Sequence, residues 1–170
     1  IDVDPGYTNA DVNGDDLLTG TPDNDVLNGF QGDDRLFGLT GDDLISGGSD
    51  NDLIQGDRGG DELFGNFGQD ILSGGLGIDT LSGNEGPDIF VVQSQNSSQS
   101  SNDVKNYDII NDFESGDLLT LDGIKFDQLS ISQDGNNTNI FDTYNNELLS
   151  TLINTSANEI TEDVLIQGVI

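Results

Sequence analysis

The sequence contains no cysteine and no histidine, and these two absences exclude much of the familiar metal and catalytic chemistry. Without cysteine there is no disulfide, no thiol nucleophile and no thiolate metal site. Without histidine the chain lacks the commonest general base and a usual zinc ligand. Lys105 and Lys125 stand in no recognisable Ser-Lys arrangement. We therefore expect the chain not to be an enzyme by itself.

Basic residues are also scarce. Four Lys and Arg face 33 Asp and Glu, which gives a formal net charge of −29. A chain this acidic is repelled by nucleic acid and by anionic membranes, so neither is expected as a partner. Cations and basic surfaces are the partners that the charge favours.

Long apolar runs are missing as well. No stretch approaches the 18 or more apolar residues that a membrane-spanning helix needs. No segment at the start reads as a signal peptide, and the chain contains no methionine. We expect the chain to be a fragment, a processed chain or an excised domain, and to be monomeric.

The chain is instead dominated by a nine-residue unit that is written eight times over residues 20–91. Glycine opens every unit: Gly20, Gly29, Gly38, Gly47, Gly56, Gly65, Gly74 and Gly83. Aspartate always takes the sixth place: Asp25, Asp34, Asp43, Asp52, Asp61, Asp70, Asp79 and Asp88. The fourth place is Gly32, Gly41, Gly59, Gly68, Gly77 and Gly86 in six units, and Asp23 and Asp50 in two. A half-formed unit with Gly14, Asp16 and Leu18 precedes them in register.

A large apolar residue at the eighth place predicts an all-β fold. The last three residues of each unit read as a minimal strand whose middle side chain points inward, and the first six read as a tight turn. Two units would then form one coil of a parallel β-roll with two facing sheets. One stack of core residues is predicted from Leu27, Ile45, Leu63 and Leu81, and the other from Leu36, Ile54, Leu72 and Phe90.

The aspartates are not explained by that core. Neighbouring strands lie about 4.8 Å apart, so aspartates 18 residues apart would stack as like charges. Such a stack becomes favourable when a hard cation lies between each pair. Carboxylates and turn carbonyls at adaptable distances suit calcium better than magnesium, which demands a stricter octahedron. Pairing every aspartate from Asp16 to Asp88 with its neighbour 18 residues on gives up to about seven ions.

The repeat G-x-x-G-x-D-x-(Leu/Ile)-x resembles the calcium-binding nonapeptide repeat of the repeats-in-toxin (RTX) family, over residues 14–91. The resemblance implies a right-handed parallel β-roll. It also implies that one ion takes the carbonyls of Gly48 and Asp50 with the Asp52 carboxylate from one loop. The next loop would add the carbonyls of Gly65 and Phe67 with the Asp70 carboxylate. Equivalent carbonyls are implied for Asp23, Gly29, Gly32, Gly38, Gly41, Gly47, Gly56, Gly59, Gly68, Gly74 and Gly77.

The composition further predicts that calcium drives folding. The roll has roughly one core aliphatic residue per nine residues, and low hydrophobicity with high charge is typical of disorder. Ion binding would neutralise the aspartates, so its free energy would become folding free energy. We expect the roll to be unfolded without calcium.

The domain organisation follows from the composition along the chain. Residues 1–13 form an N-terminal flank, 14–92 the roll, 93–102 a mobile Ser/Gln/Asn loop and 103–170 a C-terminal β cap. The cap is expected to be an antiparallel meander that includes the strands 107–113 and 118–121. This region also resembles the one that closes the roll in the RTX family. Asp108, Asp112 and Asp117 are candidates for one additional ion.

Three functions remain open. The first, implied by the RTX resemblance, is a calcium-binding module of a secreted bacterial protein that folds outside the cell and assists type I export. The second is a non-catalytic module that binds polysaccharide or a cell surface, similar to the accessory modules of bacterial alginate C5-epimerases. The third is an adhesin segment. The third place of the units carries no regular Thr or Asn, so no ice-binding face is predicted.

Overall fold

The computed structural model describes residues 7–9, 12–93, 107–122, 124–161 and 163–167. These ranges contain strands and two short 3-10 turns, η1 (Phe126–Gln128) and η2 (Ala157–Glu159). No helix in this part of the chain is long and apolar enough to cross a membrane. The first ten strands are β1 Tyr7–Asn9, β2 Leu17–Thr19, β3 Val26–Gln31, β4 Arg35–Thr40, β5 Leu44–Ser49, β6 Leu53–Arg58, β7 Glu62–Phe67, β8 Ile71–Leu76, β9 Thr80–Glu85 and β10 Ile89–Gln93. The other six are β11 Asp108–Ile110, β12 Leu118–Asp122, β13 Leu129–Asp134, β14 Asn137–Asp142, β15 Glu147–Leu152 and β16 Leu165–Gln167.

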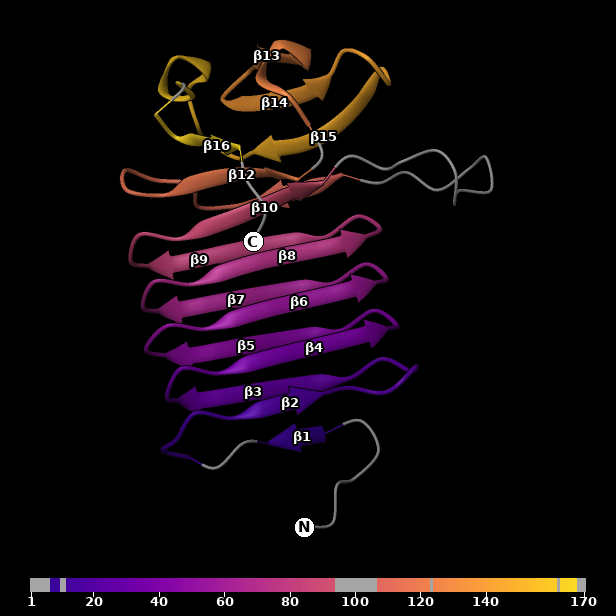
Figure 1. Ribbon diagram of the computed structural model, residues 1–170, viewed down its shortest axis with the longest axis vertical. Helices are drawn as coiled ribbons and strands as arrows, with labels where there is room; N and C mark the ends of the chain where they lie inside the picture. The colour runs from indigo at the N-terminus through magenta and orange to yellow at the C-terminus, as the bar shows by residue number, and fades with distance from the viewer. Residues whose placement is uncertain (1–6, 10–11, 94–106, 123, 162, 168–170) are drawn as a thin grey trace.

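Successive strands alternate between two sheets, which confirms the parallel β-roll (Figure 1). The odd strands β1, β3, β5, β7 and β9 lie side by side in one sheet, and the even strands β2 to β10 lie in the other. Every neighbouring pair among these strands is parallel. The offset is 18 residues in every pair except β1 with β3. Two nine-residue units therefore make one coil, as the period predicts.

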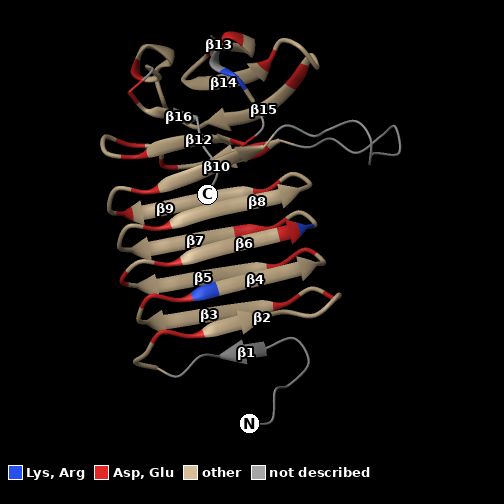
Figure 2. Ribbon diagram, in the orientation of Figure 1, with Lys and Arg blue, Asp and Glu red and all other residues tan. Residues whose placement is uncertain are grey.

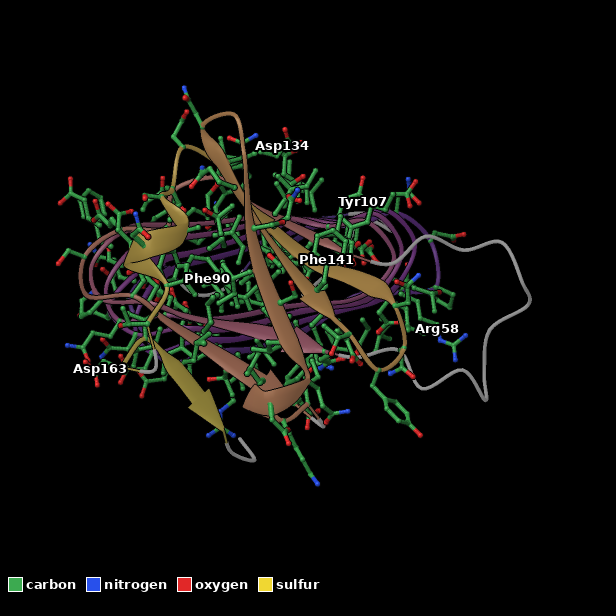
Figure 3. The ribbon with its side chains drawn as sticks, turned by 90° about the horizontal axis from the view of Figure 1, so that it is seen from above. Arg58, Phe90, Tyr107, Asp134, Phe141 and Asp163 are labelled. Carbon is green, nitrogen blue, oxygen red and sulfur yellow. The ribbon has the colours of Figure 1, made fainter. Side chains whose placement is uncertain are left out.

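The core consists of the two predicted stacks of apolar residues. In one sheet Leu27 faces Ile45, and the register continues through Leu63 to Leu81. The other sheet stacks Leu36, Ile54, Leu72 and Phe90 in the same manner. All eight side chains are at most 1% exposed. In the view along the stack, Phe90 lies between the two sheets (Figure 3). Each coil thus buries two large apolar side chains.

The strands are twice as long as predicted. Each regular strand has six residues, because the ladder continues past the eighth and ninth places into places one to three of the next unit. Only places four to six form the turn. The second place, inside the strand, has a left-handed backbone in seven units: Phe30 (φ 78°), Leu39 (80°), Gly48 (130°), Asp57 (74°), Asn66 (81°), Gly75 (104°) and Asn84 (67°). The sequence did not predict this left-handed kink inside each strand.

The roll continues beyond the repeats. β11 pairs parallel with β9, and β12 pairs parallel with β10, so the prediction that these segments belong to an antiparallel meander is wrong. In the register, Ile110 follows Leu81 and Leu119 follows Phe90, which extends both core stacks by one residue. The offset is 29 residues here and 18 within the repeats, so eleven extra residues separate this coil from the one before it. The predicted mobile loop lies outside the described residues except for Gln93, which ends β10.

The predicted antiparallel cap is confirmed for β13, β14 and β15, which pair in that order. β15 also pairs parallel with β11, and β16 pairs parallel with β12, so the cap adds a strand to each sheet of the roll. Ile140, Leu149 and Leu152 join the core cluster of the roll. The cap therefore covers both apolar stacks at their C-terminal end.

Candidate metal centre

The sixth-place aspartates form a ladder along each edge of the roll. From Asp25 to Asp88 their exposed fractions are between 0 and 3%. In each pair, the main-chain N–H of the lower aspartate donates to Oδ1 of the aspartate 18 residues later, over 2.7 to 2.9 Å. The pairs are 16/34, 25/43, 34/52, 43/61, 52/70, 61/79 and 70/88. Acidic residues mark the turns between coils in Figure 2. The structure brings together all seven predicted pairs.

The second carboxylate oxygen of these residues has no hydrogen-bond partner. Oδ2 is buried and unpartnered in eight aspartates: Asp16, Asp34, Asp43, Asp52, Asp61, Asp70, Asp79 and Asp88. A buried polar atom without a partner costs about 1 to 3 kcal/mol, and more when it carries charge. A polypeptide does not repeat such a cost at eight rungs without a compensating ligand. The orphaned oxygens are therefore the strongest indication of a bound cation.

Asp25 is the exception on the ladder. Its Oδ2 accepts hydrogen bonds from the main-chain N–H and the hydroxyl of Thr21. Thr21 thus gives Asp25 Oδ2 the partners that the other rungs lack and that a cation would provide there. The pair 25/43 is therefore the weakest of the seven candidate ion sites. Sequence reasoning missed this role, although Thr21 is the only hydroxyl residue at the second place of a unit.

The first-place glycines leave room for main-chain oxygens beside these carboxylates. A Cβ atom on Gly29, Gly38, Gly56 or Gly65 would meet Oδ2 of the aspartate in its own unit within 3.0 Å. It would also meet the carbonyl oxygen of the glycine one coil later within the same distance. A carboxylate oxygen and a main-chain oxygen therefore converge on each of these points. Both have lone pairs that a hard cation can use.

The fourth-place residues contribute another main-chain oxygen. Gly68 has a left-handed backbone (φ 144°), and a Cβ on it would collide with the carbonyl oxygen of Asp50. The same Cβ would lie 3.3 Å from Asp70 Oδ1. The Asp50 carbonyl and the Asp70 carboxylate thus lie near one another, as the ligand set implied by the RTX resemblance requires. The carboxylate of Asp50 itself is exposed and accepts a hydrogen bond from the Gly32 N–H.

Burial raises the pKa of the ladder carboxyls. Desolvation is the largest cause, and neighbouring aspartates add to it, while the main-chain N–H of the lower coil acts in the opposite direction. The pKa rises to about 7 for Asp52, Asp61 and Asp88, and to about 6 for Asp70. In the absence of a cation, the folded roll therefore favours the protonated acids. A divalent ion would reverse that preference.

A second, outer ladder connects the fifth-place residues. Asp33 accepts a hydrogen bond from the N–H of Asn51, and Asp42 accepts one from the N–H of Gly60. Both aspartates are exposed. The sequence predicted no function for this place, and in the structure its side chains join each coil to the next by hydrogen bonds. Since both side chains are exposed and neither has a buried oxygen without a partner, these aspartates are poor candidates for ion binding.

The cap supplies additional carboxylates in register with the ladder. The N–H of Asp88 donates to Asp117 Oδ1 over 2.9 Å, so Asp117, and not Asp88, ends this edge. On the other edge Asp108 follows Asp79. Asp112 accepts hydrogen bonds from the N–H groups of Gly83 and Asn84. Asp108 and Asp117 thus continue different edges, so a single ion held jointly by the three cap aspartates does not fit this arrangement.

The comparisons with known proteins identify the family. The RTX calcium-binding nonapeptide repeat matches four overlapping segments, residues 12–45, 37–72, 46–81 and 73–96, which together cover half of the chain. The chain belongs to the RTX calcium-binding nonapeptide repeat family. Its RTX repeats are calcium-binding repeats, which agrees with the all-oxygen surroundings of the ladder.

Two solved structures are similar to this RTX chain. An extracellular lipase from Serratia marcescens has 19% sequence identity and a TM-score of 0.42, with 90% of this chain and 38% of the lipase covered. A subunit of the mannuronan C5-epimerase from Azotobacter vinelandii, known from a solution structure, has 24% identity and a TM-score of 0.30, with 96% and 86% covered. The chain thus spans less than half of the lipase. No curated protein matched the sequence.

The RTX ladder fits calcium by its donor set. In the described part of the chain, no group of three acidic side chains is placed to hold a metal by itself. An ion between two rungs would therefore draw on two carboxylates and on the main-chain oxygens of the first and fourth places. Calcium accepts six to eight such oxygens in flexible geometry. When bound, it would supply positive charge to the orphaned Oδ2 atoms.

Proposed function

We propose that this chain is the calcium-folded, non-catalytic module of a secreted bacterial protein. In this proposal each aspartate pair holds one ion, up to about seven in all, and the roll orders only when calcium binds outside the cell. The observation that carries the proposal is the repeated buried Oδ2 atom without a partner. Export of the unfolded chain by a type I system is what the RTX family implies for such a module.

The charge of the chain supports the same proposal. A net charge of −29 with only four basic residues opposes a compact fold in the absence of cations. Each bound calcium would offset two of these charges, and most interior aspartates would contact the ions above and below. Neighbouring sites would therefore fill cooperatively.

The decisive experiment is far-UV circular dichroism during a calcium titration after chelation, with magnesium in a parallel titration. We expect a cooperative transition from coil to β structure at about 10⁻⁴ to 10⁻³ M calcium, which is typical of extracellular modules. Magnesium should produce little change at the same concentrations. A chain that is already rich in β structure in chelator, and indifferent to calcium, would contradict the proposal.

Two adjacent aspartates provide a matched pair for the ladder itself. Asp43→Asn removes a charge from a buried rung whose Oδ2 is unpartnered, and should lower the calcium stoichiometry and weaken the cooperative transition. Asp42→Asn removes the same charge from an exposed neighbour and keeps the oxygen that accepts the Gly60 N–H. It should leave the stoichiometry unchanged. Equal loss of ions in both variants would mean that general charge, and not the rungs, attracts the calcium.

A groove on the outer face of the even-numbered sheet favours carbohydrate binding as a second candidate function. Its volume is about 340 Å³, and it is lined by Gln55, Asp57, Arg58, Ser73 and Gln93 together with aliphatic residues. Amide, hydroxyl and charged groups on a shallow surface can bind sugar hydroxyls. Calorimetric titration with neutral and acidic oligosaccharides tests this candidate. Binding that survives Arg58→Ala and Gln93→Ala together would show that the groove is not the binding surface.

A further inference from the structure

The junction between roll and cap contains a column of three polar residues on one edge. β11 lies between β9 of the roll and β15 of the cap. Ile109 pairs with Thr80, which places Asp108 directly after Asp79 in the column. In the other direction, Asp108 pairs with Ser150 of β15. Because register partners in a parallel sheet present their side chains on the same face, the column reads Asp79, Asp108, Ser150.

Each member of this column has a buried oxygen without a hydrogen bond. The atoms are Asp79 Oδ2, Asp108 Oδ1 and Ser150 Oγ. The exposed fractions of the three residues are 0, 5 and 0%. The carboxyl groups of Asp79 and Asp108 also lie within hydrogen-bond reach of each other, a bond that forms only when one of the two is protonated. Two buried carboxylates in contact repel unless a proton or a cation lies between them.

The opposite edge ends in another way. There both oxygens of Asp117 accept main-chain hydrogen bonds, Oδ1 from the N–H of Asp88 and Oδ2 from the N–H of Glu114. The protein itself therefore satisfies the last carboxylate on that edge. Among the described residues, Asp108 has no such donor at Oδ1. Both edges are built from the sixth-place aspartates of the repeat, but the last carboxylate is fully hydrogen-bonded on one edge and has an oxygen without a donor on the other.

We propose that Asp79, Asp108 and Ser150 hold a cation that joins the cap to the roll. Two carboxylates and a hydroxyl oxygen are hard ligands, so the ion is calcium, which rests on the proposed function of the module. Asp79 belongs to the roll and Ser150 to the cap. The ion therefore fixes the cap over the end of the odd-numbered sheet, while hydrogen bonds from Asp88 and Glu114 to Asp117 fix the end of the other.

The experiment counts bound calcium by equilibrium dialysis in the full chain and three variants. Asp108→Asn should bind one ion fewer than the unaltered chain. Ser150→Ala removes only a hydroxyl and should weaken one ion about tenfold, with the others unchanged. Asp112→Asn is the matched control, because this cap carboxylate already accepts hydrogen bonds from Gly83 and Asn84. It should leave the count unaltered.

The outcomes separate this inference from the proposed function. If Asp108→Asn and Ser150→Ala both bind as many ions as the unaltered chain with equal affinity, the two carboxyls share a proton and the junction ion does not exist. If Asp108→Asn fails to fold, Ser150→Ala alone decides, by the presence or absence of the weakened ion. If the unaltered chain binds no calcium at all, the proposed function fails. Loss of ions in Asp43→Asn but not in the junction variants overturns only the junction site.

Discussion

At the scale of the residue, the roll depends on glycine for two different physical reasons. The fourth-place glycines adopt left-handed angles, for example φ 147° at Gly59. The first-place glycines have ordinary angles, and what they require is space, because the carboxylate of their own unit lies where a Cβ would stand. A first-place side chain would therefore disturb the ladder and the carbonyl beside it, and would not strain its own backbone angles.

Two glycines of one unit test this distinction. In Gly56→Ala the Cβ would lie against Asp61 Oδ2 and the Gly74 carbonyl, so we expect the loss of the ion between Asp61 and Asp79. The overpacking should also cost about 1 to 3 kcal/mol of stability in calcium. In Gly60→Ala the nearest atom is 3.4 Å away, so stability should change by less than about 0.5 kcal/mol. Calcium stoichiometry and thermal unfolding measure both. Equal behaviour of the two variants would refute the assigned role of the first place.

At the scale of the element, the left-handed kink that each strand has at the second place of the unit is the feature that the repeat did not predict. Phe30 and Leu39 adopt left-handed angles that bulky residues rarely tolerate. Asn66, Asn84, Gly48 and other residues occupy the same place elsewhere at lower cost. Glycine at this place in two units, Gly48 and Gly75, thus has a backbone origin.

Replacing one strained residue should therefore stabilise the roll. Leu39→Gly relieves a φ of 80° at a side chain that is 37% exposed, and should raise stability by about 1 kcal/mol. Leu44→Gly is the matched control, since Leu44 is 40% exposed within a strand of ordinary angles. It should lower stability by about 0.5 to 1 kcal/mol. Chemical denaturation in saturating calcium measures the difference. A loss in both variants would show that the Leu39 side chain contributes more than its backbone costs.

The sequence predicted the units, the two core stacks and the seven aspartate pairs, because each depends on a strict period and on side-chain alternation. It did not predict the coil formed by β11 and β12, because eleven additional residues interrupt the period before it. A signal was nevertheless present. Asp108 and Asp117 are nine residues apart, and each is followed two residues later by a buried apolar residue, Ile110 and Leu119. The orphaned hydroxyl of Ser150 depends on strand pairing in the cap and could not be read from the sequence.

At the scale of the whole molecule, protons and calcium compete for the same carboxylates. The pKa of Asp52, Asp61 and Asp88 is about 7 in the fold without ions, against 3.8 for an ordinary aspartate. Because the folded-state pKa is the higher one, these groups favour folding below about pH 4 and lose that contribution as the pH rises through about 7. Bound calcium imposes the opposite dependence, since it requires the carboxylates to be ionised.

Lowering the pH from 8 to 5 should therefore have opposite effects on folding in chelator and in calcium. In chelator, where the proposed function expects a coil, acidification should increase the β content, because the ladder carboxyls that the fold favours in protonated form become protonated. In calcium at a fixed concentration, the same acidification should lower the melting temperature, because protons displace the ions. Circular dichroism at four pH values, with and without calcium, measures both trends. A chelated chain whose β content stays the same or falls on acidification would contradict the raised pKa values of the ladder.

The alternation of units between two sheets gives the molecule a parity. β9 and β10 end the repeats on opposite sheets, and the strands of the last coil are matched to them, β11 to one and β12 to the other. Adding or removing a pair of units would lengthen or shorten the roll by about 4.8 Å and leave both ends unchanged. A single unit would present the cap with the wrong sheet on each side. The lengths open to such a chain during evolution, or in design, therefore form a series of even steps.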